Sequence, residues 1–185
     1  MSICYKKYKM NKLFNTIILS LFIANVFGQI SDDRQDFTQY VNPFIGTSKM
    51  GHVFPGATTP FGMVQLSPQT NFEVMFNENG SYNNKTYEYC AGYQYRDSII
   101  IGFSHTNLSG TGHADLGDFL VMPTTGPLVL DPLKTENGEK GFYSEFSHDH
   151  EEAFPGYYKV DLESYNIQAE LTASERVGFH QYTFP

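Results

Sequence analysis

Residues 157–162 read Y-Y-K-V-D-L, residues 167–173 read I-Q-A-E-L-T-A and residues 177–184 read V-G-F-H-Q-Y-T-F. Each run alternates between apolar and polar side chains, which is the pattern of a β-strand with one buried face. Short turn signals separate the runs, so they predict a β-meander. No stretch of the chain shows a convincing 3.6-residue apolar period. We therefore expect an all-β fold, an antiparallel β-sandwich whose loops gather at its ends, where ligands bind.

Upstream of the meander, residues 102–125 read G-F-S-H-T-N-L-S-G-T-G-H-A-D-L-G-D-F-L-V-M-P-T-T. Two strand-like apolar runs, Ser98–Phe103 and Phe119–Met122, enclose a loop of about a dozen residues. Loops of this length inside a compact domain are uncommon and usually functional. The loop is rich in hydroxyl, imidazole and carboxylate groups, which suit a polyhydroxylated ligand because each sugar hydroxyl can donate and accept hydrogen bonds. We interpret this central loop as one wall of a carbohydrate site.

A second segment, Val41–Leu66, is dense in glycine and proline. This composition excludes a helix and long strands, so it predicts tight turns with short strands around Val53 and at Met63–Leu66. The glycines have two open explanations, which are a close approach of the backbone to a ligand and turn geometry alone. The spacing from Gly46 to Gly51 is not followed by Lys and Ser or Thr, which excludes a phosphate-binding loop.

Residues 71–95 carry many Asn, Tyr and Glu side chains around an Asn79-Gly80 turn signal. The tyrosines that follow recur with a period close to two, which predicts a strand that shows aromatic rings to one side. Tyrosine can stack on the apolar face of a sugar ring while its hydroxyl bonds outward. Packing in a core or an interface is the alternative, and the commoner, role of such a stripe. The tyrosines are Tyr87, Tyr89, Tyr93 and Tyr95.

Residues 1–28 have the organisation of a secretory signal peptide. Four lysines precede a mostly apolar run, Leu13–Phe27, and Val26 and Gly28 are small residues at the −3 and −1 positions of a cleavage site. An uncleaved membrane anchor is the alternative, but the apolar run is about 15 residues long and a spanning helix needs about 20. We expect residues 29–37 to be a flexible lead-in and the folded domain to begin at residue 38.

Composition limits the ligands that the domain can bind. The whole chain has 12 basic and 20 acidic residues; residues 1–28 contain four of the basic and none of the acidic ones, which leaves −12 for the rest. Such a charge repels nucleic acid and anionic lipid, whereas a neutral ligand or a cation such as calcium is easier to accommodate. After signal cleavage no part of the chain is expected to lie in a membrane.

Cysteine and histidine residues give weaker signals. Cys90 is the one cysteine after the signal region, so no internal disulfide can form, and we interpret it as a small buried side chain rather than a reactive thiol. The stretch S-H-D-H-E-E at 147–152 contains His148 and His150, which could bind a metal ion. A solvated charged loop is the favoured interpretation of that stretch.

Seven strings in this order resemble the N-terminal domain of glycoside hydrolase family 92, from about residue 38 to the end of the chain. They are V-N-P-F-I-G-T at 41–47, F-P-G-A-T-T-P-F-G-M-V-Q-L-S-P at 54–68, G-Y-Q-Y at 92–95, I-G-F-S-H-T-N-L-S-G-T-G at 101–112, D-L-G-D-F-L-V-M-P-T at 115–124, P-G-Y-Y-K-V at 155–160 and A-E-L-T-A at 169–173. Each string alone is weak evidence, but the ordered set is specific. Members of the family are secreted bacterial exo-acting α-mannosidases that depend on calcium.

The resemblance implies a domain organisation and a mechanism. Family members have an N-terminal β-sandwich of the galactose-mutarotase-like, or supersandwich, type, followed by a larger (α/α)6 barrel. Residues 38–185 would be that sandwich, incomplete at its C-terminal end, and the barrel is absent. The family inverts the anomeric centre, with a glutamic acid and a carboxylate base roughly 6.5 to 9.5 Å apart. Both groups and most calcium ligands belong to the barrel, so we assign no catalytic residue and no metal ligand within this chain.

The resemblance also implies which residues face the substrate. The N-terminal domain contributes loops that close the pocket and help to select the sugar, and by position we expect two walls. The central loop supplies His105, Ser109, Thr111, Gly112, His113 and Asp115, and the glycine-rich segment supplies His52 and Phe54. Three alternatives stay open: Asp118 caps a turn, His105 is a satisfied core histidine, or a zinc ion binds His105, His113 and Asp115.

The function implied is that of the N-terminal domain of an α-mannosidase that hydrolyses terminal α-mannosyl residues of glycans with inversion. Its partners would be mannose-containing glycans and its own C-terminal catalytic domain, its cofactor calcium, and its location secreted or periplasmic. The alternative is a free-standing carbohydrate-binding β-sandwich without catalysis. A purely structural surface module is a weaker third reading.

Overall fold

The computed structural model describes residues 35–70, 72–113, 116–133 and 140–185. The contacts divide the chain into Met1–Asp36 and Phe37–Pro185, and all the strands and 3₁₀ turns of the described residues lie in the second unit. The predicted signal peptide and most of the predicted lead-in lie outside the described residues.

The described residues form eight short strands, which pair antiparallel wherever they pair. They are β1 (Ser67–Gln69), β2 (Ile99–Ile100), β3 (Gly102–Ser104), β4 (Ser144–Glu145), β5 (Glu151–Phe154), β6 (Tyr157–Leu162), β7 (Ile167–Ala173) and β8 (Gly178–Thr183). Helical structure in these residues is limited to short 3₁₀ turns, namely η1 (Thr38–Tyr40), η2 (Lys49–Gly51), η3 (Asn84–Tyr89) and η4 (His148–His150).

The meander predicted from the alternating pattern is confirmed. Strands β5, β6, β7 and β8 form one sheet in that order, with the bounds of β6 and β7 as predicted and β8 inside the predicted run. Its buried side chains alternate along the strands as the pattern requires. In the register, Val160 pairs with Ala169, which in turn pairs with Tyr182, so side chains of one face line up across the sheet.

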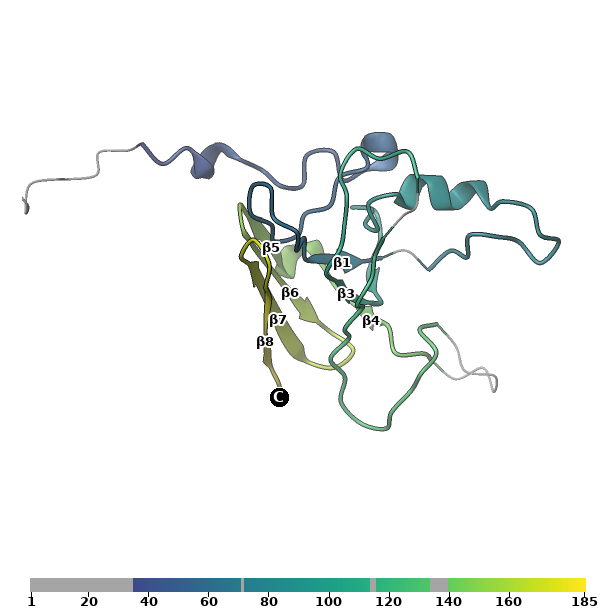
Figure 1. Cartoon of the computed structure of the whole chain (residues 1–185). Helices are drawn as coiled ribbons and strands as arrows, with labels where there is room; N and C mark the ends of the chain where they lie inside the picture. Colours follow the sequence, from purple (N-terminus) through teal and green to yellow (C-terminus); the bar gives the residue numbers. More distant parts are fainter. Residues whose placement is uncertain (1–34, 71, 114–115, 134–139) are drawn as a thin grey trace, which may run out of the picture. The chain divides into compact units, whose positions relative to one another are not determined.

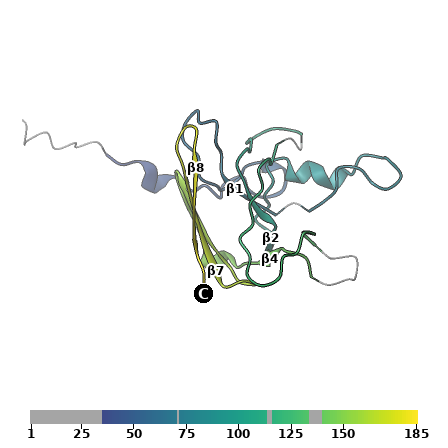
Figure 2. The same ribbon diagram turned by 60° about the horizontal axis from the view of Figure 1, so that its bottom comes forward.

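The core lies between this sheet and a second layer made of the two-stranded pairs β1–β3 and β2–β4 (Figure 1). Figure 2 shows the four-stranded sheet almost edge-on, with β1, β2 and β4 on one side of it. The second layer contributes apolar side chains from residues far apart in the sequence, and together they exclude water from one face of the meander. This antiparallel two-layer arrangement confirms the predicted sandwich class. The fully buried core includes Leu66, Ile100, Phe103, Tyr158, Val160, Leu162 and Ala169.

Backbone packing explains a glycine of the proline-rich segment. A Cβ atom on Gly56 would lie 1.7 Å from the carbonyl oxygen of Leu66. The next residue, Ala57, accepts a hydrogen bond from the Leu66 N–H at 3.0 Å, so the two backbone segments lie too close for any side chain at residue 56. At this position the packing of two protein segments accounts for the glycine.

Three predicted strands differ in the structure. No strand forms around Val53 in the described residues, and Met63–Leu66 contributes one isolated bridge, from Thr58 to Gln65. The run Phe119–Met122 also makes a single bridge, from Val121 to Phe103, because Phe119 has a φ of 57° and turns the chain out of the extended conformation. These runs are apolar, but turns break each of them before a ladder can grow.

The predicted tyrosine strand is also wrong. Residues 84–89 form the 3₁₀ helix η3, which begins where the Asn83 side chain accepts a hydrogen bond from the Lys85 N–H at 3.1 Å. Gly92, with a φ of 79°, then reverses the chain. As a result Tyr89 and Tyr93 are buried, whereas Tyr87 and Tyr95 are exposed. The Asn79-Gly80 turn is confirmed by a hydrogen bond from the Gly80 N–H to the Asn77 carbonyl.

The acidic stretch at 147–152 is solvated only in part: Asp149, His150 and Glu152 are exposed, as predicted, but Glu151 is not. Glu151 begins β5 and its side chain is fully buried, where it accepts hydrogen bonds from Tyr93 Oη, Tyr158 Oη and His148 Nδ1. The distances are 3.0, 2.6 and 2.6 Å. Burial, followed by the charge of Glu151, raises the pKa of both tyrosine hydroxyls. The three donors compensate for removing the carboxylate from water.

Two histidines join the last strand to the central loop. His105 Nε2 and His180 Nε2 lie 3.0 Å apart, with the rings stacked at 4.8 Å between centroids. His105 Nδ1 donates to the Phe119 carbonyl at 2.8 Å, and His180 Nδ1 lies 2.7 Å from Tyr182 Oη. Burial and the neighbouring His105 lower the pKa of His180 to about 4. One proton shared between the facing nitrogens satisfies both rings, whereas a proton on every ring nitrogen would set two cations against each other.

We expect Glu151→Ala to lower the free energy of unfolding by about 3 kcal/mol, because it leaves two buried hydroxyls and an imidazole without their acceptor. The matched control is Glu152→Ala, which removes a neighbouring half-exposed carboxylate paired with Lys159 and should cost less than about 1 kcal/mol. Chemical denaturation measures both values. Equal losses in the two variants would contradict a structural role for the Glu151 cluster.

The His105–His180 pair should make stability depend on pH. Because the pKa of His180 is lower in the folded chain than its ordinary value of 6.5, the unfolded chain takes up this proton first as the pH falls. The contribution of His180 to stability is therefore complete above pH 6.5 and is lost progressively toward pH 4. Denaturation curves measured from pH 6.5 to pH 4 should show a smaller fall in the free energy of unfolding for His180→Gln than for the unmodified chain. Parallel pH profiles would show that the pair does not contribute.

Candidate functional site

The two predicted walls meet at His52. His52 ends the η2 turn in a left-handed conformation, with a φ of 51°, and is 8% exposed. Its carbonyl accepts a hydrogen bond from the Gly110 N–H at 2.7 Å, and its Nδ1 donates to the Thr111 carbonyl at 2.7 Å. The glycine-rich segment and the central loop are therefore fastened to each other by backbone and ring contacts. In a neutral ring whose Nδ1 carries the proton, Nε2 is an acceptor, and it has no hydrogen-bond partner among the described residues.

A tyrosine lies against this contact. The rings of Tyr87 and His52 meet edge to face, with centroids 5.0 Å apart. A Cβ atom placed on Gly112 would lie 3.3 Å from Tyr87 Oη, so the loop backbone passes close to the hydroxyl. Tyr87 is 41% exposed. The arrangement presents an aromatic ring and a hydroxyl beside the imidazole, which is the combination that sugar rings bind.

The other side of η3 borders a small cavity of about 120 Å³. Thr86, Tyr89 and Cys90 line it from η3 and its end, and Leu116 and Gly117 line it from the central loop. At about 30 Å³ for each water, the cavity holds roughly four waters or one substituent of a ligand, and it is too small for a whole sugar. Cys90 is buried, as expected, and its Sγ donates to the Tyr87 carbonyl.

Two buried amides, Gln69 and Asn107, line this cavity and are joined by hydrogen bonds. Gln69 Nε2 donates to Ser104 Oγ at 2.6 Å and to Asn107 Oδ1 at 2.8 Å. Asn107 Nδ2 donates in turn to the Gln65 carbonyl and to Ser104 Oγ. Gly92 permits this packing, since a Cβ there would lie 2.1 Å from Gln69 Oε1. The sequence prediction missed Gln69 and Asn107, because an isolated amide residue carries no signal that distinguishes it from a surface residue.

His105 lies apart from the wall that contains His52. As described above, it packs on His180 and the Phe119 carbonyl, at the base of the central loop. The loop is closed there by hydrogen bonds from the His105 N–H to the Asp118 carbonyl and from Thr106 Oγ1 to Asp118 Oδ2. These contacts agree with the two alternatives in which His105 is a satisfied histidine and Asp118 stabilises a turn.

The remaining predicted residues are distributed as follows. Ser109, Gly112 and His113 are exposed, and Thr111 Oγ1 donates to the His113 carbonyl at 2.9 Å. Phe54 is 7% exposed and belongs to the buried residues, so its ring is not available to a ligand in this conformation. Asp115 lies outside the described residues. Their role in binding stays a prediction.

A roomier cavity of about 770 Å³ contains none of the predicted site residues. It lies beside β2 and β4, where Ile99, Leu133 and Phe146 give it an apolar lining and Asp131, Glu145 and Glu163 an acidic one. The polar chemistry expected of a sugar site is gathered instead around His52, Tyr87 and the central loop. We therefore take that region, which we call the His52 wall (His52, Tyr87 and residues 109–112), as the candidate site.

The residues that the structure describes carry neither a metal-ligand cluster nor a membrane-spanning helix. No group of three or more His, Cys, Asp or Glu residues among them could hold a metal ion. The zinc alternative includes Asp115 and so is not tested, and calcium stays a prediction from the family resemblance. Among the same residues no helix has both the length and the apolar character to cross a bilayer.

Comparisons with known proteins give a consistent picture. The model of the glycosyl hydrolase family 92 N-terminal domain matches residues 40–185. A family GH92 alpha-mannosidase from Bacteroides thetaiotaomicron, solved with mannoimidazole, is 43% identical with a TM-score of 0.71, over 82% of this chain and 18% of that one. A family GH92 inverting mannosidase from the same species is 28% identical with a TM-score of 0.55, over 80% and 18%.

A curated relative, an uncharacterized secreted glycosidase from Arthroderma benhamiae, is 28% identical over 176 residues. The match covers 91% of this chain and 20% of that protein, so the chain spans about a fifth of the length of the relatives it matches. The family model covers most of the chain, and the solved relatives share its antiparallel two-layer fold. Residues 40–185 match the N-terminal domain of glycosyl hydrolase family 92, and the chain therefore belongs to this family.

Proposed function

We propose that residues 38–185 supply the substrate-selecting wall of an α-mannosidase that removes terminal α-mannosyl residues from glycans with inversion. The observation that carries this proposal is the fastening of His52 to Gly110 and Thr111. Both segments were expected to face the sugar from the sequence, although about 60 residues separate them, and the fold brings them into direct contact. The names of the solved relatives, which include alpha-mannosidases, support the choice of sugar.

The chemistry of the His52 wall fits a sugar ring. Tyr87 offers a partly exposed aromatic face, and the backbone and side chains of residues 109–112 offer donors and acceptors. His52 Nε2 adds an acceptor that lacks a donor among the described residues. An unsatisfied buried acceptor costs about 1 to 3 kcal/mol, so a hydroxyl that reached it would be favoured. These groups discriminate between hydroxyl arrangements, which is the property expected of a specificity wall.

The reacting groups are assigned to the catalytic barrel of the family. The general acid, the general base and most calcium ligands would lie there, and none of the carboxylates of residues 38–185 is given a catalytic role. Calcium would bind adjacent mannose hydroxyls, since a hard cation exchanges its waters for sugar oxygens readily. What this chain would contribute is orientation: its hydrogen-bond donors and acceptors hold the sugar while the reaction proceeds elsewhere.

The remaining parts of the proposal concern location and partners. Cleavage of residues 1–28 would release the protein to the periplasm or the exterior, where mannose-containing glycans are met. The name of the curated relative, a secreted glycosidase, supports this location. The partner in the protein itself would be a C-terminal catalytic domain. The alternative is a free-standing carbohydrate-binding sandwich, which would bind the sugar through the same His52 wall without hydrolysing it.

A chimaeric enzyme tests the proposal. Residues 38–185 would replace the matching segment of the 43% identical Bacteroides thetaiotaomicron alpha-mannosidase. We expect the chimaera to hydrolyse α-mannosides, and His52→Ala to raise its KM about tenfold with little change in kcat, because the wall contributes binding rather than chemistry. The control is His150→Ala, whose side chain is 60% exposed and lies on η4, outside the wall.

The chain alone provides the second arm of this test. Titrated with methyl α-mannoside and followed by NMR, it should show shifts for residues of the His52 wall and no hydrolysis. Hydrolysis by the chain alone would overturn the assignment of the reacting groups to the barrel. An unchanged KM in the His52→Ala chimaera would contradict the role of the wall.

A further inference from the structure

Gln94 is a buried amide at the centre of a polar junction. Its side chain is 1% exposed and lies in the G-Y-Q-Y segment, between Tyr93 of the core and Tyr95. Its backbone N–H donates to Thr70 Oγ1 at 3.0 Å, which fixes the segment to the end of β1. The side chain then makes three hydrogen bonds, all to the backbone of other segments. Both N–H groups of the amide and one of the two lone pairs of its oxygen are therefore used.

Two of these bonds hold a single residue of the η2 turn. Gln94 Oε1 accepts from the Lys49 N–H at 2.7 Å, and Gln94 Nε2 donates to the Lys49 carbonyl at 2.7 Å. Lys49 has a φ of 53°, and His52, three residues later, has a φ of 51°. Left-handed conformations are unfavourable for residues with a side chain, so they persist where the surroundings impose them. The Gln94 amide imposes the first of the two.

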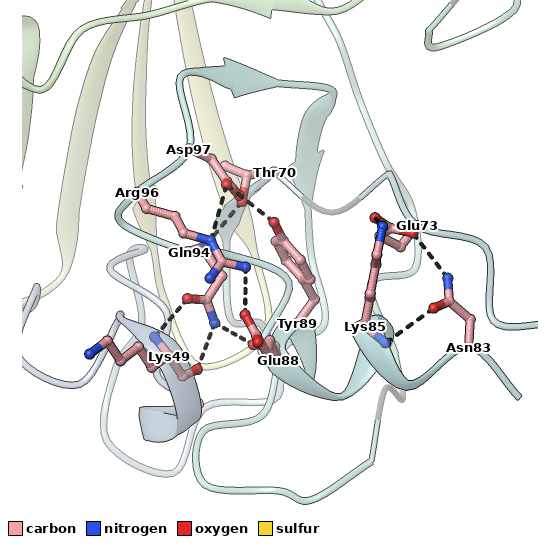
Figure 3. Close-up of polar contacts among 10 residues, drawn as sticks. All are labelled: Lys49, Thr70, Glu73, Asn83, Lys85, Glu88, Tyr89, Gln94, Arg96 and Asp97. Carbon is pink, nitrogen blue, oxygen red and sulfur yellow. Dashed lines mark hydrogen bonds and ion pairs between the residues drawn. The ribbon is translucent and has the colours of Figure 1, made fainter.

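The third bond reaches the other side of the His52 wall. Gln94 Nε2 also donates to the carbonyl of Glu88, which lies in η3 directly after Tyr87. Figure 3 shows the amide between Lys49 and Glu88, with a contact to each. One side chain thus joins the turn that carries His52 to the helix that carries Tyr87. The centroids of the His52 and Tyr87 rings lie 5.0 Å apart.

We propose that Gln94 is the positioning residue of the His52 wall: it fixes the separation of His52 and Tyr87, and through His52 the place of Gly110 and Thr111, without touching the sugar itself. The effect of Gln94 on sugar binding rests on the proposed function. Its effect on the positions of His52 and Tyr87 does not. The ligand class is a neutral hexopyranoside, whose affinity would depend on the spacing that Gln94 maintains.

A merely structural role would predict something different. Any buried amide with three side-chain bonds contributes to stability, and its loss would loosen the domain as a whole. The positioning role predicts a local change instead, in which the His52 wall separates while the meander stays protected. The Gly110 N–H, which donates to the His52 carbonyl, and the amides of β6 and β7 report these two regions separately.

The test uses the full chain and the variant Gln94→Met, which keeps the length of the side chain and removes its donors and acceptor. We expect hydrogen exchange at Gly110 to become about tenfold faster, the change produced by the loss of about one hydrogen bond. The nuclear Overhauser effect between the His52 and Tyr87 rings should weaken. Exchange at Val160 and Ala169, in the centre of the meander, should not change. The matched control is Gln168→Met, which loses a hydrogen bond to Asp161 on the outer face of β7.

A titration with methyl α-mannoside completes the experiment. We expect Gln94→Met to bind at least about tenfold more weakly than the unmodified chain and Gln168→Met to bind equally well. Unchanged Gly110 exchange and ring contacts in Gln94→Met, or equally faster exchange at Val160, would overturn the positioning role. If the unmodified chain does not bind the mannoside, the proposed function fails, while Gly110 exchange and the ring contact still decide what Gln94 does.

Discussion

The packing of the buried face of the meander on Leu66 and Phe103 is the constraint on which the other features depend. Both side chains are fully buried, and both lie in or beside the β1–β3 pair. The segments that make the candidate site leave from this pair: the glycine-rich segment leads into β1, and the central loop follows β3. If the meander did not cover these side chains, the β1–β3 pair would not be held in place, and neither segment would have a defined position. The apolar contact therefore determines where the polar groups can meet.

Buried polar groups then select one arrangement of the loops. Glu151, Gln69 and Gln94 are each buried, and each binds partners far away in the sequence. Apolar packing tolerates small shifts, whereas a buried amide or carboxylate loses its partners when the geometry changes. All three groups meet at segment 92–95: Glu151 binds Tyr93, Gln69 packs against Gly92, and Gln94 binds Lys49. The segment 92–95 is thus the structural link between the core and the site.

The meander could be predicted from the sequence because its pattern is local. The alternation of apolar and polar residues identifies the buried face of each strand, and the short turns determine which strands pair. The tyrosine run has the same period but forms no strand, since Asn83 begins a 3₁₀ helix and Gly92 reverses the chain. The local pattern places Glu151 in solvent, because it cannot show that the hydroxyls of Tyr93 and Tyr158 lie beside it. The family resemblance predicts that His52 and the central loop face one sugar, but it does not predict their contact with each other. Gln94 could not be found, since its partners are backbone groups of distant residues.

Under the proposed function, a mannose unit lies against His52, Tyr87 and residues 109–112. Intermolecular nuclear Overhauser effects between methyl α-mannoside and the labelled chain test it most directly, because they report contact rather than affinity. We expect transfer from the sugar protons to the Tyr87 ring and to the Gly110–Thr111 backbone. Transfer to Ile99 and Phe146 of the roomier cavity, with none to Tyr87, would contradict it.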